Sequence, residues 1–344
     1  MSRIVAQVEL RGSQKSFGEG LLVDLIAALR STREGELVAL TLTSAATGED
    51  LARWAEVTGN SIVGVTEESD GIRWVIRHGA VPQDEPERPI GRRLWLYTNF
   101  DCNLACTYCC VRSSPRAPRR ELGFSRIQRI ANESRELGVE EIFITGGEPF
   151  LLSDIGDVIR ACAEAAPTTV LTNGMLFKGS RLEALRNLPR DRVTLQISVD
   201  SASPELHDRN RGAGSWDRAM AGVELGRALG FRVRWAATVQ REEDERAIRD
   251  FLDGSQIVSE DRVIRRTALR GFAEEGLALS RADLVPEVTI TDRGVYYHPV
   301  GADDDDFLIT TEIFPLAEAF DAVKRAFTRE RALRTKMAQI FNCA

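Results

Sequence analysis

The alternation of apolar and polar positions divides the first eighty residues into short strands and two helices. The helices are predicted at residues 21–30 and 48–57. The Asp70-Gly71 pair predicts a hairpin turn between the last two strands. The strands are predicted at Val5–Leu10, Glu36–Thr43, Ser61–Glu67 and Ile72–Arg77. This βαβαββ order is typical of a small two-layer sandwich, in which two helices back one sheet.

Farther along the chain, apolar runs alternate regularly with amphipathic stretches. In the first such stretch Phe124, Ile127, Ile130 and Leu137 share one helical face, and Gly138 follows as a stop. The apolar runs are predicted to be strands at Leu94–Tyr97, Glu141–Thr145, Thr168–Leu171, Val193–Val199, Val233–Thr238 and Val263–Thr267. About six βα units of this kind predict an α/β fold with a partial (β/α)6 barrel.

The same pattern sets the expected domain boundaries. Residues 1–80 form the small α/β domain, and residues 81–91, with three prolines among charges, form an exposed linker. Residues 92–270 form the barrel. Residues 271–344 form a C-terminal extension, with short strands near 288–290 and 295–297 and a terminal helix over about 316–340.

Three cysteines immediately after the first barrel strand carry the strongest chemical signal. Cys102, Cys106 and Cys109 lie on a loop at the carboxyl end of a parallel strand, where barrels place their chemistry. Spacings of three and two residues let one short loop give three thiolates to a cubic cluster and leave one iron open. A structural zinc site needs a fourth Cys or His, and only Cys110 lies close by.

This CxxxCxxC motif, with the aromatic Tyr108 before its third cysteine, resembles the radical S-adenosylmethionine (SAM) superfamily. The resemblance implies one 4Fe-4S cluster held by the three cysteines, with SAM on the open iron. One electron, from a donor such as a flavodoxin or ferredoxin, then cleaves SAM to methionine and a 5'-deoxyadenosyl radical. The radical abstracts a hydrogen atom from the substrate.

Later strand ends resemble the SAM-binding motifs of the same superfamily. Gly146, Gly147 and Glu148, followed by a proline, resemble the GGEP motif, which contacts the methionyl amino group. Residues 207–212 resemble an HDxxRG stretch, which implies that Ser198 and Arg211 hold the methionyl carboxylate. The resemblance further assigns SAM contacts to Tyr108, Thr172 and Asn173, and places Gln240 near the ribose.

The N-terminal domain resembles the TusA-like sulfur-carrier fold over roughly residues 4–79. A sulfur carrier needs a Cys-Pro pair at the start of its first helix, and this chain has Phe17-Gly18-Glu19-Gly20 there. No cysteine precedes Cys102. The domain is therefore expected to dock a protein partner or the substrate and not to carry a persulfide.

Residues 288–299 resemble the short hairpin of SPASM and twitch extensions, in a degenerate form. Members of those families have a cysteine where this chain has His298, so an auxiliary cluster is not expected. His298 and Cys343 are the candidate catalytic residues of the substrate cavity, with Cys343 as a hydrogen donor, thiol nucleophile or unusual ligand. The alternative is a histidine with only a structural role and an incidental terminal thiol.

Composition narrows the choice of partners. A formal charge of −7 and a pI near 5.3 argue against a nucleic-acid partner. No apolar run approaches the ~20 residues that cross a bilayer, so a cytoplasmic location without membrane contact is expected.

Three functions follow from these residues. The first is a radical SAM enzyme that modifies an unknown peptide or small molecule in a biosynthetic pathway. The second is radical sulfur insertion or sulfur-for-oxygen exchange on a small molecule. The third is a non-catalytic iron-sulfur protein that binds partners or transfers electrons.

Overall fold

The computed structural model describes residues 4–13, 21–33, 35–43, 47–48, 51–52, 54–55, 60–79, 89–255 and 257–340. The chain divides into two compact units, Met1–Glu87 and Arg88–Ala344. Cys343, residues 17–20 and most of the expected linker lie outside the described residues. Among the helices of the described part, none is long and apolar enough to cross a membrane.

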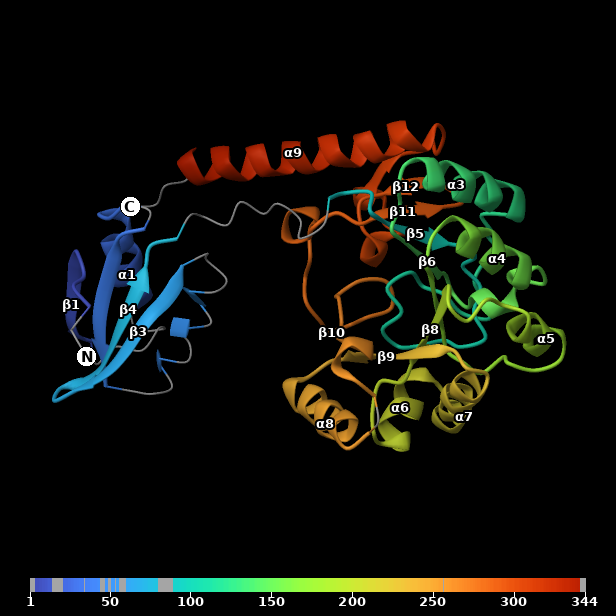
Figure 1. Ribbon diagram of the computed structural model, residues 1–344, viewed down its shortest axis with the longest axis horizontal. Coiled ribbons are helices and arrows are strands. Elements are labelled where there is room, and N and C mark those ends of the chain that lie inside the picture. The colour runs from blue at the N-terminus through green and yellow to red at the C-terminus, as the bar shows by residue number, and fades with distance from the viewer. Residues whose placement is uncertain are drawn as a thin grey trace. The chain divides into compact units, whose positions relative to one another are not determined.

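The N-terminal unit contains one four-stranded sheet with a helix packed on it (Figure 1). Strand β1 pairs in parallel with β2, and β4 pairs antiparallel with both β2 and β3. Leu25 on the helix packs with Leu40 and Ile76 on the sheet, which forms a small core of its own. Residues 47–48, 51–52 and 54–55 are helical, as expected for the second helix. The elements are β1 (Val8–Ser13), α1 (Leu21–Arg30), β2 (Leu37–Leu42), β3 (Ser61–Glu68) and β4 (Gly71–Arg77).

Six parallel strands, in the order β10-β9-β8-β7-β6-β5, form the centre of the second unit. These are the six strands that the apolar runs predict, with bounds that differ by two residues at most. They are β5 (Arg93–Tyr97), β6 (Glu141–Thr145), β7 (Thr168–Thr172), β8 (Val193–Ser198), β9 (Arg232–Val239) and β10 (Arg262–Arg266). The mixed α/β class with a parallel sheet is confirmed.

Helices connect successive parallel strands and lie along the outside of the curved sheet (Figure 1). In the first, Ile127 and Ile130 are buried as the period predicts, whereas Leu137 lies just past the helix and is exposed, so its predicted place on the buried face is wrong. The helices are α3 (Phe124–Glu136), α4 (Ile155–Ala165), α5 (Ser180–Arg186), α6 (Pro204–Arg211), α7 (Ser215–Ala228) and α8 (Glu242–Asp253).

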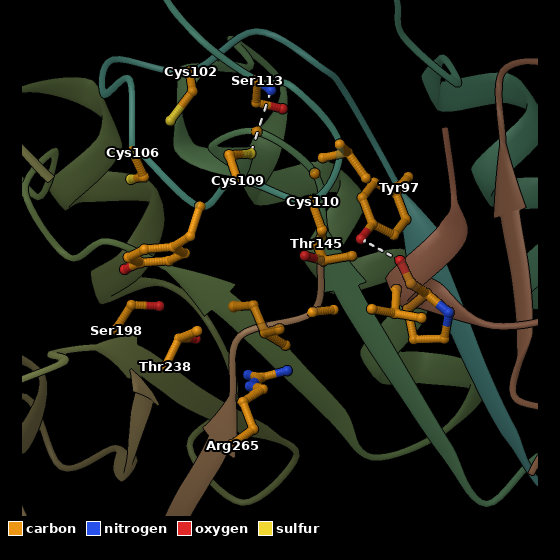
Figure 2. A pocket seen from close by; sticks show the side chains of 18 of the residues that line it. Tyr97, Cys102, Cys106, Cys109, Cys110, Ser113, Thr145, Ser198, Thr238 and Arg265 are labelled. Carbon is orange, nitrogen blue, oxygen red and sulfur yellow. Dashed lines mark hydrogen bonds between the residues drawn. The ribbon is translucent and has the colours of Figure 1, made fainter. Parts of the chain in front are cut away.

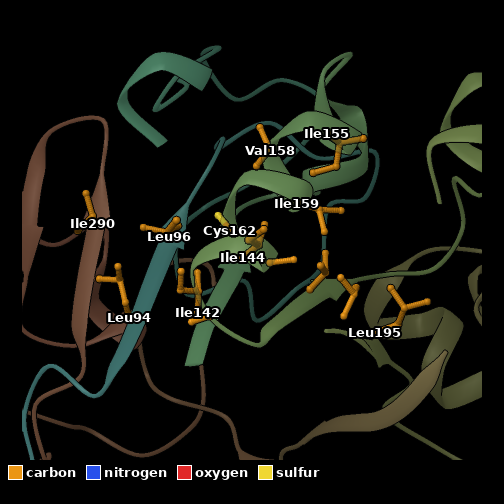
Figure 3. Packing of buried hydrophobic residues seen from close by; sticks show 14 of the residues in the cluster. Leu94, Leu96, Ile142, Ile144, Ile155, Val158, Ile159, Cys162, Leu195 and Ile290 are labelled. Carbon is orange, nitrogen blue, oxygen red and sulfur yellow. The ribbon is translucent and has the colours of Figure 1, made fainter. Parts of the chain in front are cut away.

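The core of this unit lies between the sheet and its helices (Figure 3). Ile142 and Ile144 of β6 pack with Ile159 and Cys162 of α4, and all four side chains are fully buried. Burial raises the pKa of Cys162 to about 12, so this thiol is a small apolar core residue. It takes no part in the site.

The C-terminal segment continues the barrel sheet. Strand β11 (Val288–Thr291) pairs in parallel with β5, and β12 (Gly294–Tyr296) forms the expected hairpin with β11. A third strand that the sequence did not predict, β13 (Leu308–Thr310), pairs with β12, and α9 (Leu316–Ile340) follows. The sheet therefore has nine strands, and the hairpin brings His298 to the barrel mouth.

Candidate functional site

The three cysteines lie on one loop after β5, at the carboxyl end of the parallel sheet. Backbone amides stabilise two of the sulfur atoms, since Leu104 N–H donates to Cys102 Sγ at 3.4 Å and Ser113 N–H donates to Cys109 Sγ at 3.3 Å. Figure 2 shows Cys102, Cys106 and Cys109 together on this loop, across the pocket from Ser198 and Thr238 in this view. All three line one cavity of about 370 Å³.

Burial favours the neutral form of the Cys102 and Cys106 thiols until a cation is present. Burial raises the pKa of Cys102, and the nearby carboxylate of Glu148 raises it further. Burial likewise raises the pKa of Cys106. Within the described ranges, no group of three His, Cys, Asp or Glu side chains lies close enough together to hold one metal ion. Three soft donors around an open space fit a larger iron-sulfur cluster.

The two glycines after β6 allow the cysteine loop to approach the strand end closely. Gly147 N–H donates to Asn99 O at 2.9 Å, and a Cβ on Gly147 would lie 2.0 Å from Asp101 O. Gly146 has a φ of +152°, and a Cβ there would lie 2.5 Å from Asn99 O. The sequence predicted close approach of a ligand at this position, and the structure places the backbone of the cysteine loop there. Both glycines also line the cavity.

Glu148 lies behind the cavity wall and is fully buried. Its carboxylate accepts hydrogen bonds from Phe150 N–H at 3.0 Å, the Thr172 hydroxyl at 2.8 Å and Asn173 N–H at 2.8 Å. Burial raises the pKa of Glu148, although these donors act in the opposite direction. The carboxylate joins the ends of β6 and β7. It is not among the residues that line the cavity, and the contact with the methionyl amino group that its motif implies stays a prediction.

Asp200, just beyond β8, organises the opposite wall. Its carboxylate accepts two hydrogen bonds from Arg211, at 2.6 and 3.2 Å, one from Thr238 N–H at 3.0 Å and one from the Tyr108 hydroxyl. Burial alone raises the pKa of Asp200, but Arg211 and the other donors bring it below its ordinary value. The backbone N–H of Asp200 donates to Nδ1 of the buried His207 at 3.2 Å, which connects the segment after β8 to α6.

Sequence reasoning did not include Asp200 among the site residues. The available signal was its position two residues after Ser198, where an acid ends a buried strand. Its role became visible only with its partners, because Tyr108 is 92 positions away in the chain.

The cavity brings together most of the residues that the sequence selected. Gln240 is not among the residues that line this cavity. It lines a second pocket with Ala105 and Phe272, and Cys106 lines both pockets. Cys343 lies outside the described residues. The selected residues that line the cavity are Cys102, Cys106, Cys109, Tyr108, Gly146, Gly147, Thr172, Asn173, Ser198, Arg211 and His298.

His298 lines the cavity on the side of the C-terminal hairpin. Its Nδ1 accepts a hydrogen bond from Val300 N–H at 3.1 Å, which leaves Nε2 as the N–H donor of the neutral ring. Burial lowers the pKa of His298 to about 4, and the charge of Arg265 lowers it further. The ring is therefore neutral near pH 7. A catalytic role for His298 stays a prediction.

Comparison with known proteins locates the family resemblance in the barrel. Residues 96–253 match the family model described as the Radical SAM superfamily. The AdoMet-dependent heme synthase of Methanosarcina barkeri is 32% identical over 152 residues, 44% of this chain and 43% of that protein. The mycofactocin maturase MftC of Mycolicibacterium smegmatis is 35% identical over 138 residues, 40% and 34% of the two chains. The chain spans less than half the length of these curated relatives.

Among solved structures, anSMEcpe with bound AdoMet superposes with a TM-score of 0.52 at 13% identity. The superposition covers 66% of this chain and 77% of that one. At this identity the likeness shows the fold alone. The family match begins at residue 96, so the resemblance of the N-terminal unit to a sulfur carrier stays a prediction.

Proposed function

Because this chain carries a radical SAM domain at residues 96–253, we propose that it cleaves SAM reductively and uses the resulting radical on a peptide or small-molecule substrate. One observation carries the proposal. The three cysteines of the CxxxCxxC loop line the same cavity as the ends of β6, β7 and β8. A cluster held by these three cysteines needs room beside it for SAM and the substrate, and this cavity supplies the space.

Cys102, Cys106 and Cys109 would hold the cluster through their thiolates. A 4Fe-4S cluster with one iron free of protein ligands supplies the site for SAM and the electron that cleaves it. Burial that keeps the Cys102 and Cys106 thiols neutral in the bare protein makes their proton loss depend on metal binding. The amide donors at Cys102 Sγ and Cys109 Sγ then stabilise the charged sulfur atoms.

Arg211 would bind the methionyl carboxylate of SAM, together with Ser198. Its Nε and one N–H of Nη2 already bond Asp200, which leaves three of its five guanidinium N–H groups for a ligand. Asp200 is therefore a positioning residue that fixes the guanidinium beside the cavity. Tyr108 is held in the same way through its hydroxyl.

The other wall of the SAM site would consist of the strand ends joined by Glu148. Thr172 and Asn173 line the cavity, and Glu148 fixes both through the bonds described above. We assign Glu148 to positioning rather than to ligand contact. Gln240 is left out of the proposed SAM site because it lies in the second pocket.

The substrate class stays open between peptides and small molecules. One relative is named as a heme synthase and another as a mycofactocin maturase, so both classes occur among similar proteins. A flavodoxin or ferredoxin would deliver the electron, and the N-terminal unit would dock a protein partner or the substrate. Radical sulfur insertion is the less supported alternative, because the carrier position has no cysteine.

Anaerobic reconstitution with iron, sulfide, reductant and SAM tests the proposal. The wild-type chain should bind about four irons and release 5'-deoxyadenosine. Cys106→Ala should lose that product. Cys162→Ala is the matched control, because Cys162 is buried in the core away from the cavity, and it should keep both iron and product.

The three hypotheses give different results in this experiment. A wild-type chain that binds four irons but releases no 5'-deoxyadenosine would contradict the proposed function and favour the electron-transfer alternative. About eight irons per chain would point to a second cluster. Sulfur incorporated into a product would favour the insertion chemistry.

A further inference from the structure

Two arginines at the end of β10 enter the cavity beyond the cysteine loop. Arg265 and Arg266 both line it, and Figure 2 shows Arg265 extending into the pocket from the strand below. The charge of Arg265 acts on Tyr97, Cys110 and His298, after burial has shifted the pKa of each. Arg211 is not among the charges that act on these three residues, so we treat the Arg265 end of the cavity separately from the side that Arg211 lines.

Arg265 differs from Arg211 in having no counterion. Among the described residues, the Arg265 side chain makes no hydrogen bond or ion pair, and it is solvent-exposed and lines the cavity. Arg211, by contrast, is paired with Asp200. Arg266 donates to Gln240 O at 2.8 Å, and its Nε is buried without a partner in the described part of the chain. The guanidinium of Arg265 and the Nε of Arg266 therefore remain without partners in the described part of the chain.

No other cavity-lining residue of the described part carries a negative side chain that could neutralise the charge of Arg265. The described residues that line the cavity include no Asp, Glu or Lys. His298 is neutral near pH 7 because its pKa is about 4. The Arg265 guanidinium is solvent-exposed, so water and salt screen its charge, and its attraction for an anion acts at short range inside the cavity that it lines.

Several apolar side chains line the same cavity as Arg265. Leu279 and Leu284, from the segment after β10, and Val300, from the C-terminal segment, line the same cavity as Trp95. Pockets that combine an apolar wall with a few placed polar groups select ligands that have an apolar body and one polar handle. In this cavity the polar group of such a ligand would carry a negative charge, because it would face Arg265.

We infer that Arg265 binds a carboxylate of the substrate, and that the apolar wall holds the substrate's hydrocarbon part. This inference rests on the proposed function, because it assigns the anion to the molecule that the radical attacks. The planar guanidinium fork matches a carboxylate with two parallel hydrogen bonds. The Arg265 site thus selects acids over neutral analogues.

A carboxylate fits this end better than a phosphate does. A phosphate group carries close to two negative charges at pH 7 and offers three acceptor oxygens. Arg265 is the one lining cation in the described residues without any partner, and no lysine supports it. Arg266 beside it already donates to Gln240 O, so Arg265 presents the one guanidinium fork that is wholly free, and a planar carboxylate matches such a fork.

Binding of small probes to the reconstituted, SAM-loaded, unreduced full chain tests the inference without turnover. The probes are 3-phenylpropionate, its uncharged amide and phenyl phosphate, measured by saturation-transfer NMR. The acid should bind wild-type protein at least about tenfold more tightly than the amide. Arg265→Gln should abolish this preference, and Arg265→Lys should keep part of it. Arg249→Gln, an exposed arginine on α8, is the matched control and should leave it unchanged.

The other outcomes overturn the inference. They are equal binding of acid and amide by wild type, no binding of the acid, tighter binding of phenyl phosphate, or an unchanged preference in Arg265→Gln. A loss of SAM affinity in Arg265→Gln without a change in probe preference would assign Arg265 to SAM instead. The release of 5'-deoxyadenosine is measured separately, so failure of the inference stays distinguishable from failure of the proposed function.

Discussion

Glu148 and Asp200 lie at the tips of two strands of one sheet, and both are buried, yet their surroundings move their pKa values in opposite directions. Glu148 contacts neutral donors, two backbone amides and a hydroxyl. Asp200 contacts a guanidinium as well as neutral donors. At Glu148 the neutral donors and the charge of Arg211 do not overcome the effect of burial on the pKa, whereas at Asp200 the hydrogen-bonded Arg211 and the other donors together do so. Glu148 thus joins the ends of β6 and β7, whereas Asp200 holds the guanidinium of Arg211 in place.

The largest effect is expected from removing the charge of Asp200. Asp200→Asn leaves Arg211, whose side chain is 11% exposed, without its counterion. Loss of one partner of a buried pair costs about 3–5 kcal/mol. Urea unfolding measures this change in the free energy of unfolding.

The control for this substitution is Asp244→Asn, which removes the same charge from a pair with the exposed Arg241. It should cost about 1 kcal/mol or less. An Asp200→Asn protein as stable as this control would mean that Arg211 finds another partner, and the contrast between the two strand tips would fail.

A smaller effect is expected from Glu148→Gln. The amide keeps one acceptor oxygen but turns an N–H group toward a donor such as Asn173 N–H. An unsatisfied buried donor costs about 1–3 kcal/mol. Urea unfolding measures this loss, with Glu245→Gln as the control, because the half-buried Glu245 pairs with the exposed Arg249. A loss equal to that of Asp200→Asn would show that the two carboxylates are held in the same way.

The smallest effect is a difference in pH dependence. The folded-state pKa of Glu148 lies above its ordinary value of 4.5, so the folded protein keeps this proton where the unfolded chain has lost it. Its contribution to stability therefore falls as pH rises through that range. Asp200 has a lowered pKa, so its contribution is present above 3.8 and is lost as pH falls through the folded-state value.

Unfolding of the cluster-free chain between pH 4.5 and 7 measures this difference. Wild-type protein should lose stability relative to Glu148→Gln as the pH rises, and the relative stability of Asp200→Asn should stay constant. If the stability relative to wild type changed with pH by the same slope in Glu148→Gln and in Asp200→Asn, the opposite pKa shifts of Glu148 and Asp200 would be contradicted.

The barrel strands could be predicted closely because each is a buried, continuous apolar run. Glu141–Thr145 is predicted and observed with identical bounds. Strand β13 was missed because Leu308–Thr310 is only three residues long and half-buried, too short for any period to appear. Its position follows from pairing with β12, which no local pattern encodes.

The site was predictable in its cysteines but not in its polar partners. The spacing of Cys102, Cys106 and Cys109 is a local property, and all three line the cavity. The partners of Glu148 and Asp200 come from other strands, and Gln240 follows β9 yet lies in another pocket. Strand order brings residues to one edge of a sheet, whereas side-chain direction decides which cavity each one enters.

The pairing of β5 with β11 has a consequence for the nascent chain. Leu94 and Val288 are register partners, so one side of β5 lacks its neighbour until roughly 190 further residues have been synthesised. At about 5–20 residues per second, that delay is roughly 10–40 s. During this interval an apolar strand edge next to the cysteine loop is open to pairing with other chains. The barrel mouth therefore assembles late, after the ribosome has synthesised β11 near the C-terminus.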